Sequence, residues 1–359
     1  MSTLFDTVTF AHGPSLKSRF MLAPLTNSQS AADGTLSDEE YRWLTMRAEG
    51  GFALTMTCAS HVQAVGQGFP GQLGCFDDAH IPGLARLAEG IKQHDSLAVV
   101  QLHHAGRRSP KELIGTDPVS SSADEKMGAR AMTTAEVEQM IEDFISAAIR
   151  VQKAGFQGVE LHGAHDYLIC QFLNEELNKR RDKFGGTLEN RARVLFNIVA
   201  GIRDCCGEDF HIAVRLSPER FGMKTSDIVQ VYKRLVKEGN VDMIDMSLWD
   251  CFKLGADEDF ADQRLIDIFA NLERGDVKLA VAGKLYSAED MQKCIDAGAD
   301  IVAVGRAAVT NHDFPLQTRN NPKFVMRELP VPRATLREEG LSDTFIGYMG
   351  NWPGFAEAE

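Results

Sequence analysis

Short apolar runs that alternate with helical stretches constrain the fold of this chain most strongly. They predict eight strands, at residues 20–25, 53–59, 97–102, 158–162, 212–216, 243–247, 279–282 and 301–304. Strands that are apolar along their whole length are typical of parallel sheets whose faces are covered by helices. The alternation therefore predicts an α/β fold, and eight strand–helix units favour a single (β/α)₈ TIM barrel.

Polar residues and glycines bound the helical stretches. The predicted N-caps are Thr133, which forms a capping-box pattern with Glu136, then Thr187, Thr225 or Ser226, and Ser287. The predicted helix stops are Gly155, Gly239 and Gly298. An open doubly wound sheet is the alternative fold, but no GxGxxG motif follows the first strand.

The chain shows no internal repeat, no low-complexity tract and no linker, so residues 1–359 are expected to form one domain. Two long connections are expected over the functional face. Residues 104–132 are predicted to form a lid or a small inserted hairpin, and residues 248–262 are predicted to form a second loop. A tail begins at about residue 330, and its aromatic segment 347–355 either docks on a neighbouring copy or packs on its own chain.

Composition excludes several classes of function. A dispersed net charge of −13 argues against nucleic-acid binding. No run approaches the roughly 18 apolar residues of a membrane span, and the N-terminus lacks the pattern of a signal peptide. The seven cysteines are scattered and form no CxxC pair, which predicts reduced thiols and a cytoplasmic protein.

The stretch VELHGAHDY, residues 159–167, carries the most specific chemistry. A strand ends in His162, and His165 and Tyr167 follow closely. Two neutral imidazoles can hold one oxygen between them, and a phenol can deliver a proton nearby. A structural role for a histidine at a strand end is the alternative. A metal site is a further alternative, but no HExxH motif or carboxylate set completes one, so no metal is predicted.

The carboxyl ends of barrel strands form one functional surface. Besides His162, the strand ends present Ala23-Pro24-Leu25-Thr26, Gln101, Arg215, Ala282-Gly283-Lys284 and Gly305-Arg306. Glycine with a cation after the last two strands suits a phosphate, although the glycines also fit simple turns. Gln101 matches the edge of a pyrimidine-like ring, and Arg215 either stabilises a reduced ring or forms a structural salt bridge. Together these features suggest flavin mononucleotide (FMN) facing an electrophile.

The chain resembles the old yellow enzyme family of flavin-dependent ene-reductases. The resemblance rests on four segments that follow the family's order: LFDTVTF…LKSRFMLAPLTN, QLHHAGRRS, residues 162–193 and residues 281–315. It implies non-covalent FMN, reduction by NADH or NADPH, and a second half-reaction that reduces an activated alkene in the same pocket. Such alkenes are α,β-unsaturated carbonyl or nitro compounds.

The resemblance also implies residue roles. The backbone of Ala23, Pro24 and Leu25 would lie along the flavin, and the Thr26 hydroxyl would reach its O4 region. Cys58, Gln101 and Arg215 would contact the pyrimidine edge. Ala282, Gly283, Lys284, Gly305 and Arg306 would form the phosphate side. His162 and His165 would clamp the substrate oxygen, and Tyr167 would protonate the substrate carbon.

Three positions depart from the family pattern. His103 stands where many relatives carry Trp, Asp166 where Gly is usual, and Phe184 where Tyr is usual.

Three rival functions remain: a metal-dependent hydrolase that uses His162 and His165, an aldolase or isomerase that uses Lys284, and a flavoprotein that only binds or stores its cofactor. The sequence leaves homo-oligomerisation, the preferred nucleotide and the physiological substrate open.

Overall fold

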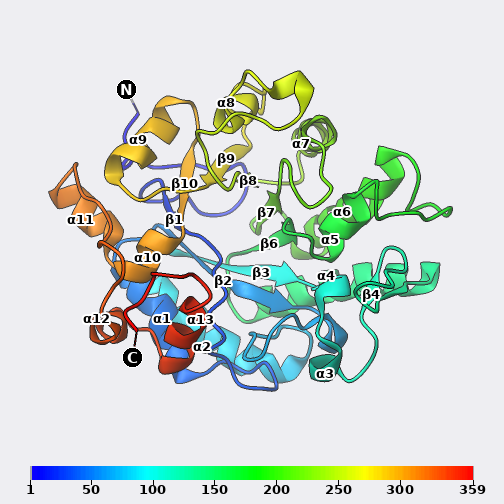
Figure 1. Ribbon diagram of the computed structural model, residues 1–359, viewed down its shortest axis with the longest axis horizontal. Coiled ribbons are helices and arrows are strands. Elements are labelled where there is room, and N and C mark those ends of the chain that lie inside the picture. Colours follow the sequence, from blue (N-terminus) through cyan, green and yellow to red (C-terminus); the bar gives the residue numbers. More distant parts are fainter. Residues whose placement is uncertain (1, 359) are drawn as a thin grey trace.

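Parallel strands close into a barrel in the order β1-β10-β9-β8-β7-β6-β3-β2 (Figure 1). The computed structural model describes residues 2–358. The barrel strands are β1 (Phe20–Leu22), β2 (Leu54–His61), β3 (Leu97–His103), β6 (Gly158–Gly163), β7 (His211–Leu216), β8 (Met243–Ser247), β9 (Lys278–Ala282) and β10 (Ile301–Val304). Two further strands, β4 (Val119–Ser120) and β5 (Arg130–Ala131), form a separate pair.

Helices surround the barrel. They are α1 (Asp38–Glu49), α2 (Ile81–Lys92), α3 (Lys111–Ile114), α4 (Thr134–Lys153), α5 (Leu168–Leu173), α6 (Leu188–Cys206), α7 (Thr225–Glu238), α8 (Leu265–Ala270), α9 (Ala288–Asp296), α10 (Arg306–Thr310), α11 (Phe314–Asn320), α12 (Arg333–Glu338) and α13 (Asp343–Met349). Short 3₁₀ turns are η1 (Ala64–Gly66), η2 (Asp78–His80), η3 (Gly106–Arg108) and η4 (Glu258–Phe260). Within residues 2–358, none of these helices has both the length and the apolar character that crossing a bilayer requires.

The predicted barrel and its eight strands are confirmed. The first strand is shorter than predicted and ends at Leu22. Pro24 lies just beyond it and has no N–H to donate to a neighbouring strand, which accounts for the early end. The long connection after β3 is not a simple hairpin, because β4 and β5 pair in parallel.

The helix caps follow the local sequence with one exception. Thr133, Thr187 and Ser287 each accept a backbone N–H at the start of their helices, and Thr133 forms the predicted capping box with Glu136. The prediction for α7 is wrong, because Lys224 holds the N-cap position and makes no side-chain cap bond. Instead, the carboxylate of Asp257 accepts the N–H of Thr225 from a distant loop.

The hydrophobic core has two layers. One lies between the barrel and its helices, and the other fills the barrel interior with residues such as Met21, Leu54 and Met243. The N-terminal segment closes the amino end of the barrel, where Val8 pairs with Leu16 and the ring of Phe10 lies 4.5 Å from that of His211. The amino end is therefore sealed, and the carboxyl end carries the site.

The C-terminal helices pack on their own chain, beside α1 (Figure 1). The Phe345 ring meets the Trp43 ring edge-on at 4.8 Å. The buried Arg47 donates to the backbone oxygen of Glu339 at 2.7 Å and also to that of Ala308. Of the two placements predicted for the aromatic tail, self-packing is the one that this single chain shows.

Candidate active site

Strand register brings distant polar residues together at the carboxyl end of the barrel. Gln101 of β3 pairs in register with Glu160 of β6, and His162 of β6 pairs with Arg215 of β7. Arg215 pairs in turn with Asp245 of β8. Residues that are far apart in sequence therefore line one mouth.

His162, His165 and Tyr167 form a compact cluster, as predicted. The two imidazole centroids are 5.1 Å apart, and the His162 and Tyr167 centroids are 4.9 Å apart. The intervening turn is unusual, because His165 and Asp166 both have left-handed backbone angles, with φ of 59° and 63°. This turn bends the chain so that the residues after β6 fold back over its end.

The protonation states suit hydrogen-bond donation to a neutral oxygen. Burial, followed by the charges of neighbouring groups, holds the pKa of His162 well below its usual value. Burial and Arg215 lower the pKa of His165 to about 3, so both rings are neutral near pH 7. The Nδ1 atom of His162 accepts the backbone N–H of Ala164 at 3.3 Å, which places the ring proton on Nε2. Burial raises the pKa of Tyr167, so its phenol keeps the proton.

Two neighbours of this cluster escaped the sequence reasoning. Ser247, at the end of β8, lies with its Oγ 2.7 Å from Nε2 of His165 and so influences which nitrogen of that ring carries the proton. Gln72 donates to Nδ1 of His103 at 3.0 Å. Ser247 stands at a strand end, which is a signal that the sequence offered, whereas nothing local marks Gln72.

His103 belongs to the site itself. Its ring meets the Tyr167 ring edge-on at 4.3 Å and lies 5.5 Å from that of His162. The buried Nε2 atom of His103 has no hydrogen-bond partner within residues 2–358. His103, in place of the Trp that many relatives carry, therefore changes the wall of the pocket next to Tyr167, the predicted proton donor.

A buried polar group lies deeper in the barrel, below the cluster. Gln101 donates to Oε1 of the fully buried Glu160 at 2.7 Å, and Arg215 pairs with Asp245 at 3.0 Å. Burial, and next the charge of Asp245, raise the pKa of Glu160 to about 8. The salt bridge considered for Arg215 thus exists, and the same residue also borders His162. Neither Glu160 nor Asp245 was anticipated from sequence.

The residues present fit FMN at this mouth. The amide oxygen Oε1 of Gln101 is available to a ligand, because it accepts no hydrogen bond from the part of the chain described. Arg306 lies over the Tyr286 ring and forms no ion pair with a carboxylate of residues 2–358. A Cβ at Gly305 would meet nothing nearer than Leu25, at 3.9 Å, so its backbone faces open space. These are groups that a ring edge and a phosphate would satisfy.

The other half of the predicted phosphate side is already engaged. A Cβ at Gly283, which follows Ala282 at the end of β9, would lie 2.8 Å from the backbone nitrogen of Asp250, so close packing explains this glycine. Lys284 pairs with the Asp250 carboxylate at 3.0 Å. Gly283 and Lys284 remain predicted phosphate contacts, but loop packing accounts for their present positions.

A cavity of about 190 Å³ lies beside the predicted flavin face. Its walls are Pro24, Leu25, Thr26, Arg306, Val309, Phe345, Tyr348, Met349 and Trp352. Thr26 and Tyr348 line this cavity together, so the C-terminal segment borders a predicted cofactor residue. The thiol of Cys58 donates to Glu40 of α1 at 3.2 Å, which leaves the backbone of Cys58 for the predicted cofactor contact.

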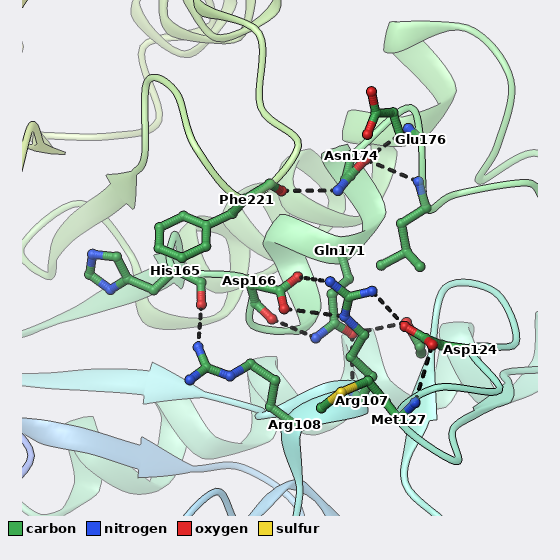
Figure 2. Close-up of polar contacts among 12 residues, drawn as sticks. Arg107, Arg108, Asp124, Met127, His165, Asp166, Gln171, Asn174, Glu176 and Phe221 are labelled. Atoms are coloured by element: carbon green, nitrogen blue, oxygen red, sulfur yellow. Dashed lines mark hydrogen bonds and ion pairs between the residues drawn. The ribbon is translucent and has the colours of Figure 1, made fainter.

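Two arginines tie the loop after β3 to the turn at His165 and Asp166 (Figure 2). Arg107 donates to both carboxylate oxygens of Asp166, at 2.7 and 3.2 Å, and to Asp124 at 2.6 Å. Gln171 donates to the backbone oxygen of Asp166 at 2.6 Å. Asp166, which replaces the usual glycine, therefore fixes the turn that separates His165 from Tyr167.

The rival sites receive no geometric support. Within residues 2–358, no group of three or more His, Cys, Asp or Glu side chains is arranged to hold a metal ion. Lys284, the candidate for aldolase chemistry, is half exposed and paired with Asp250, outside the histidine cluster.

Comparisons with known proteins agree on one family. Residues 3–323 match the NADH:flavin oxidoreductase / NADH oxidase family. The "Probable NADH-dependent flavin oxidoreductase YqiG" of Bacillus subtilis is 32% identical, over 88% of this chain and 87% of that protein. The NADH:acrylate oxidoreductase of Vibrio harveyi is 33% identical over 85% of this chain, which spans only 32% of that longer protein. A structure of morphinone reductase in complex with tetrahydroNAD has a TM-score of 0.81 and 26% identity, covering 96% of this chain and 97% of its own.

Proposed function

The chain belongs to the NADH:flavin oxidoreductase / NADH oxidase family, of old yellow enzyme type, and is an FMN-dependent oxidoreductase; from this premise we propose that it reduces the activated C=C bond of α,β-unsaturated carbonyl or nitro compounds. NADH or NADPH is the reductant, and the two substrates use one pocket in turn, in a ping-pong cycle. The observation that carries the proposal is the pair of neutral imidazoles, His162 and His165, beside the phenol of Tyr167.

The imidazoles have the chemistry of an oxygen clamp. A neutral imidazole N–H donates to a carbonyl or nitro oxygen without placing a full charge beside it. As negative charge grows on that oxygen during reduction, these donors stabilise it more strongly than they stabilise the bound substrate. Ser247 and Ala164 orient the rings through hydrogen bonds to their second nitrogens.

Tyr167 has the chemistry of the acid. Its pKa is raised by burial, so the phenol holds its proton at neutral pH and can release it to carbon only as carbanion character develops. His103 and His162 pack against its ring and fix its direction. The remaining polar groups, Gln101, Arg215, Gly305 and Arg306, would hold the cofactor.

When bound, FMN supplies hydride exchange between the nicotinamide and the alkene. The protein's own contribution is to hold both substrates in one place and to supply the hydrogen bonds and the proton. A shared pocket means that oxidised nicotinamide must leave before the alkene enters, which explains the ping-pong order.

Stopped-flow measurement of the two half-reactions tests this proposal. The purified holoprotein is reduced anaerobically with NADH and, separately, with NADPH. It is then mixed with 2-cyclohexenone or with a nitroalkene. We expect the flavin spectrum to return to the oxidised form at a rate that depends on alkene concentration. Reduction without reoxidation by any activated alkene would favour the binding or storage role.

We further propose that the protein works in the cytoplasm. All seven cysteines are free thiols, and six of them are buried or packed in the core. Free thiols are typical of reducing compartments. Fractionation of the source cells with an antibody against the protein tests this location.

A further inference from the structure

Arg108 lies beside the turn at His165 and Asp166, but it plays no part in the roles described so far. It closes η3, directly after β3. Its Nη1 atom donates to the backbone oxygen of His165 at 2.7 Å, as Figure 2 shows. Its guanidinium carbon lies 4.8 Å from the centroid of the Tyr167 ring. The cation is therefore held next to both the oxygen clamp and the proton donor.

Arg108 differs sharply from its neighbour Arg107. Arg107 is neutralised by Asp124 and Asp166. Arg108 forms no ion pair with any carboxylate of residues 2–358, and its side chain is exposed to solvent. Arg107 thus stabilises the loop, and Arg108 places a positive charge without a carboxylate partner at the mouth of the pocket.

The surroundings of Arg108 contain little negative charge. Its charge acts on His103, His162 and His165, which are neutral, and on the phenols of Tyr167 and Tyr348. Its charge also acts on the thiol of Cys170 and on the carboxylate of Asp166, and that carboxylate is held by Arg107. Arg220, stacked on Trp249 at 3.9 Å, adds a second cation near His165. In a chain with a net charge of −13, this cationic mouth is a local exception.

We infer that Arg108 is a specificity-determining residue that binds a carboxylate carried by the alkene substrate. The inference rests on the proposed function and names a class for its substrate: an activated alkene that also carries an acid group. A guanidinium recognises a carboxylate through paired N–H donors, and the Nη2 and Nε donors of Arg108 remain for this purpose.

A nicotinamide phosphate suits this position less well. Arg108 lies beside the ring of the proton donor, so its partner must sit close to the reacting carbon. The phosphates of NADH and NADPH are separated from the nicotinamide ring by a ribose. A carboxylate attached directly to the alkene meets the distance requirement, and the experiment distinguishes the two sources.

Two matched enones test the inference. One is trans-4-oxo-2-pentenoate, and the other is 3-penten-2-one, which carries a methyl group in place of the carboxylate. The value of kcat/KM is measured for both with wild-type protein, Arg108→Met and Arg108→Lys. Arg130→Met is the matched control, because it removes one exposed cation of the same loop that is paired with Glu136.

We expect Arg108→Met to lower the ratio of kcat/KM for the acid to kcat/KM for the neutral enone by about 10- to 100-fold, the range of a charge-assisted hydrogen bond. Arg108→Lys should retain part of the preference, and Arg130→Met should leave the ratio unchanged. Added salt should weaken the wild-type preference, since the site is open to solvent.

Several results would overturn the inference. An unchanged ratio in Arg108→Met would mean that the residue does not read the acid group, and equal losses on both enones would mean that it only supports the turn. A loss of flavin reduction by both NADH and NADPH would assign Arg108 to the phosphates that the two nucleotides share, and a loss selective for NADPH would assign it to the extra phosphate of that nucleotide. Wild-type protein that reduces neither enone would instead overturn the proposed function.

Discussion

Asp242 at the amino end of the barrel and three donors at its carboxyl end differ in how fully the protein itself provides them with partners. At the amino end, Asp242 accepts hydrogen bonds from the backbone and ring of His12, from the backbone of Ile212 and from Arg203, all within 3.0 Å. At the carboxyl end, Arg306 and Arg108 have no carboxylate partner within residues 2–358, and Nε2 of His103 has no hydrogen-bond partner there.

This contrast separates stability from function. A buried carboxylate that is fully hydrogen-bonded contributes to folding, and breaking such a group is costly. Donors that are left open contribute little to folding but can bind a ligand as soon as it arrives. We therefore expect substitutions of the open donors at the carboxyl end to change chemistry, and substitution of Asp242 at the amino end to change stability.

The largest effect is expected for Tyr167→Phe, which removes only the acidic proton. Reoxidation of the reduced holoprotein by an enone should slow about 10²- to 10⁴-fold, the usual contribution of a general acid. Reduction by the nicotinamide needs no such proton and should be almost unaffected. Stopped-flow absorbance at the flavin band measures both steps. Equal slowing of both half-reactions would show that Tyr167 only shapes the pocket.

Asp242→Ala should produce the opposite result. Removing the carboxylate leaves the buried Arg203 without its partner, so the free energy of unfolding should fall by about 3–5 kcal/mol. Urea denaturation measures the loss, and Asp242→Asn, which keeps an acceptor oxygen, should lose less. Holoprotein that remains folded should keep the wild-type rates of both half-reactions. A large fall in those rates without a fall in stability would break the contrast.

Arg306→Ala tests an open cation at the carboxyl end. If Arg306 binds the phosphate, FMN affinity should fall by about 1.5–3 kcal/mol, the value of a charge-assisted hydrogen bond. Titration of apoprotein with FMN, followed by flavin fluorescence, gives the dissociation constant. Lys284→Ala is the comparison variant and should have a smaller effect, because Lys284 is already paired with Asp250. Unchanged affinity in Arg306→Ala would make that residue architectural.

Glu160→Gln tests the buried polar group beneath the site through the pH dependence of the free energy of unfolding. The folded protein raises the pKa of Glu160 from 4.5 to about 8. The folded state therefore keeps this proton after the unfolded chain has lost it, so the associated stability is complete below pH 4.5 and is lost as the pH rises to about 8.

The amide variant has no proton to lose. Its stability should therefore fall less than that of the wild type between pH 5 and 8, and the difference in slope should not exceed about 1.4 kcal/mol per pH unit. Urea denaturation of the two holoproteins at several pH values gives both slopes. Identical slopes would show that Glu160 is ionised in the folded protein.

The sequence by itself determined the barrel, its eight strands and the residues at the strand ends. Apolar runs mark buried strands locally, and parallel strands in a closed barrel must present their carboxyl ends together. The clustering of His162, His165 and Tyr167 followed from the same reasoning.

Only the tertiary structure decided which polar groups are satisfied and which stay open. Asp257 caps α7 from 32 residues away, and Glu40 accepts a hydrogen bond from the thiol of Cys58. Glu160 accepts one from Gln101, which lies 59 residues away in the sequence. Barrel closure creates these contacts between distant segments, and no local periodicity encodes them. For the same reason, two adjacent arginines look alike in the sequence, yet Arg107 is neutralised by two carboxylates and Arg108 has no carboxylate partner among residues 2–358.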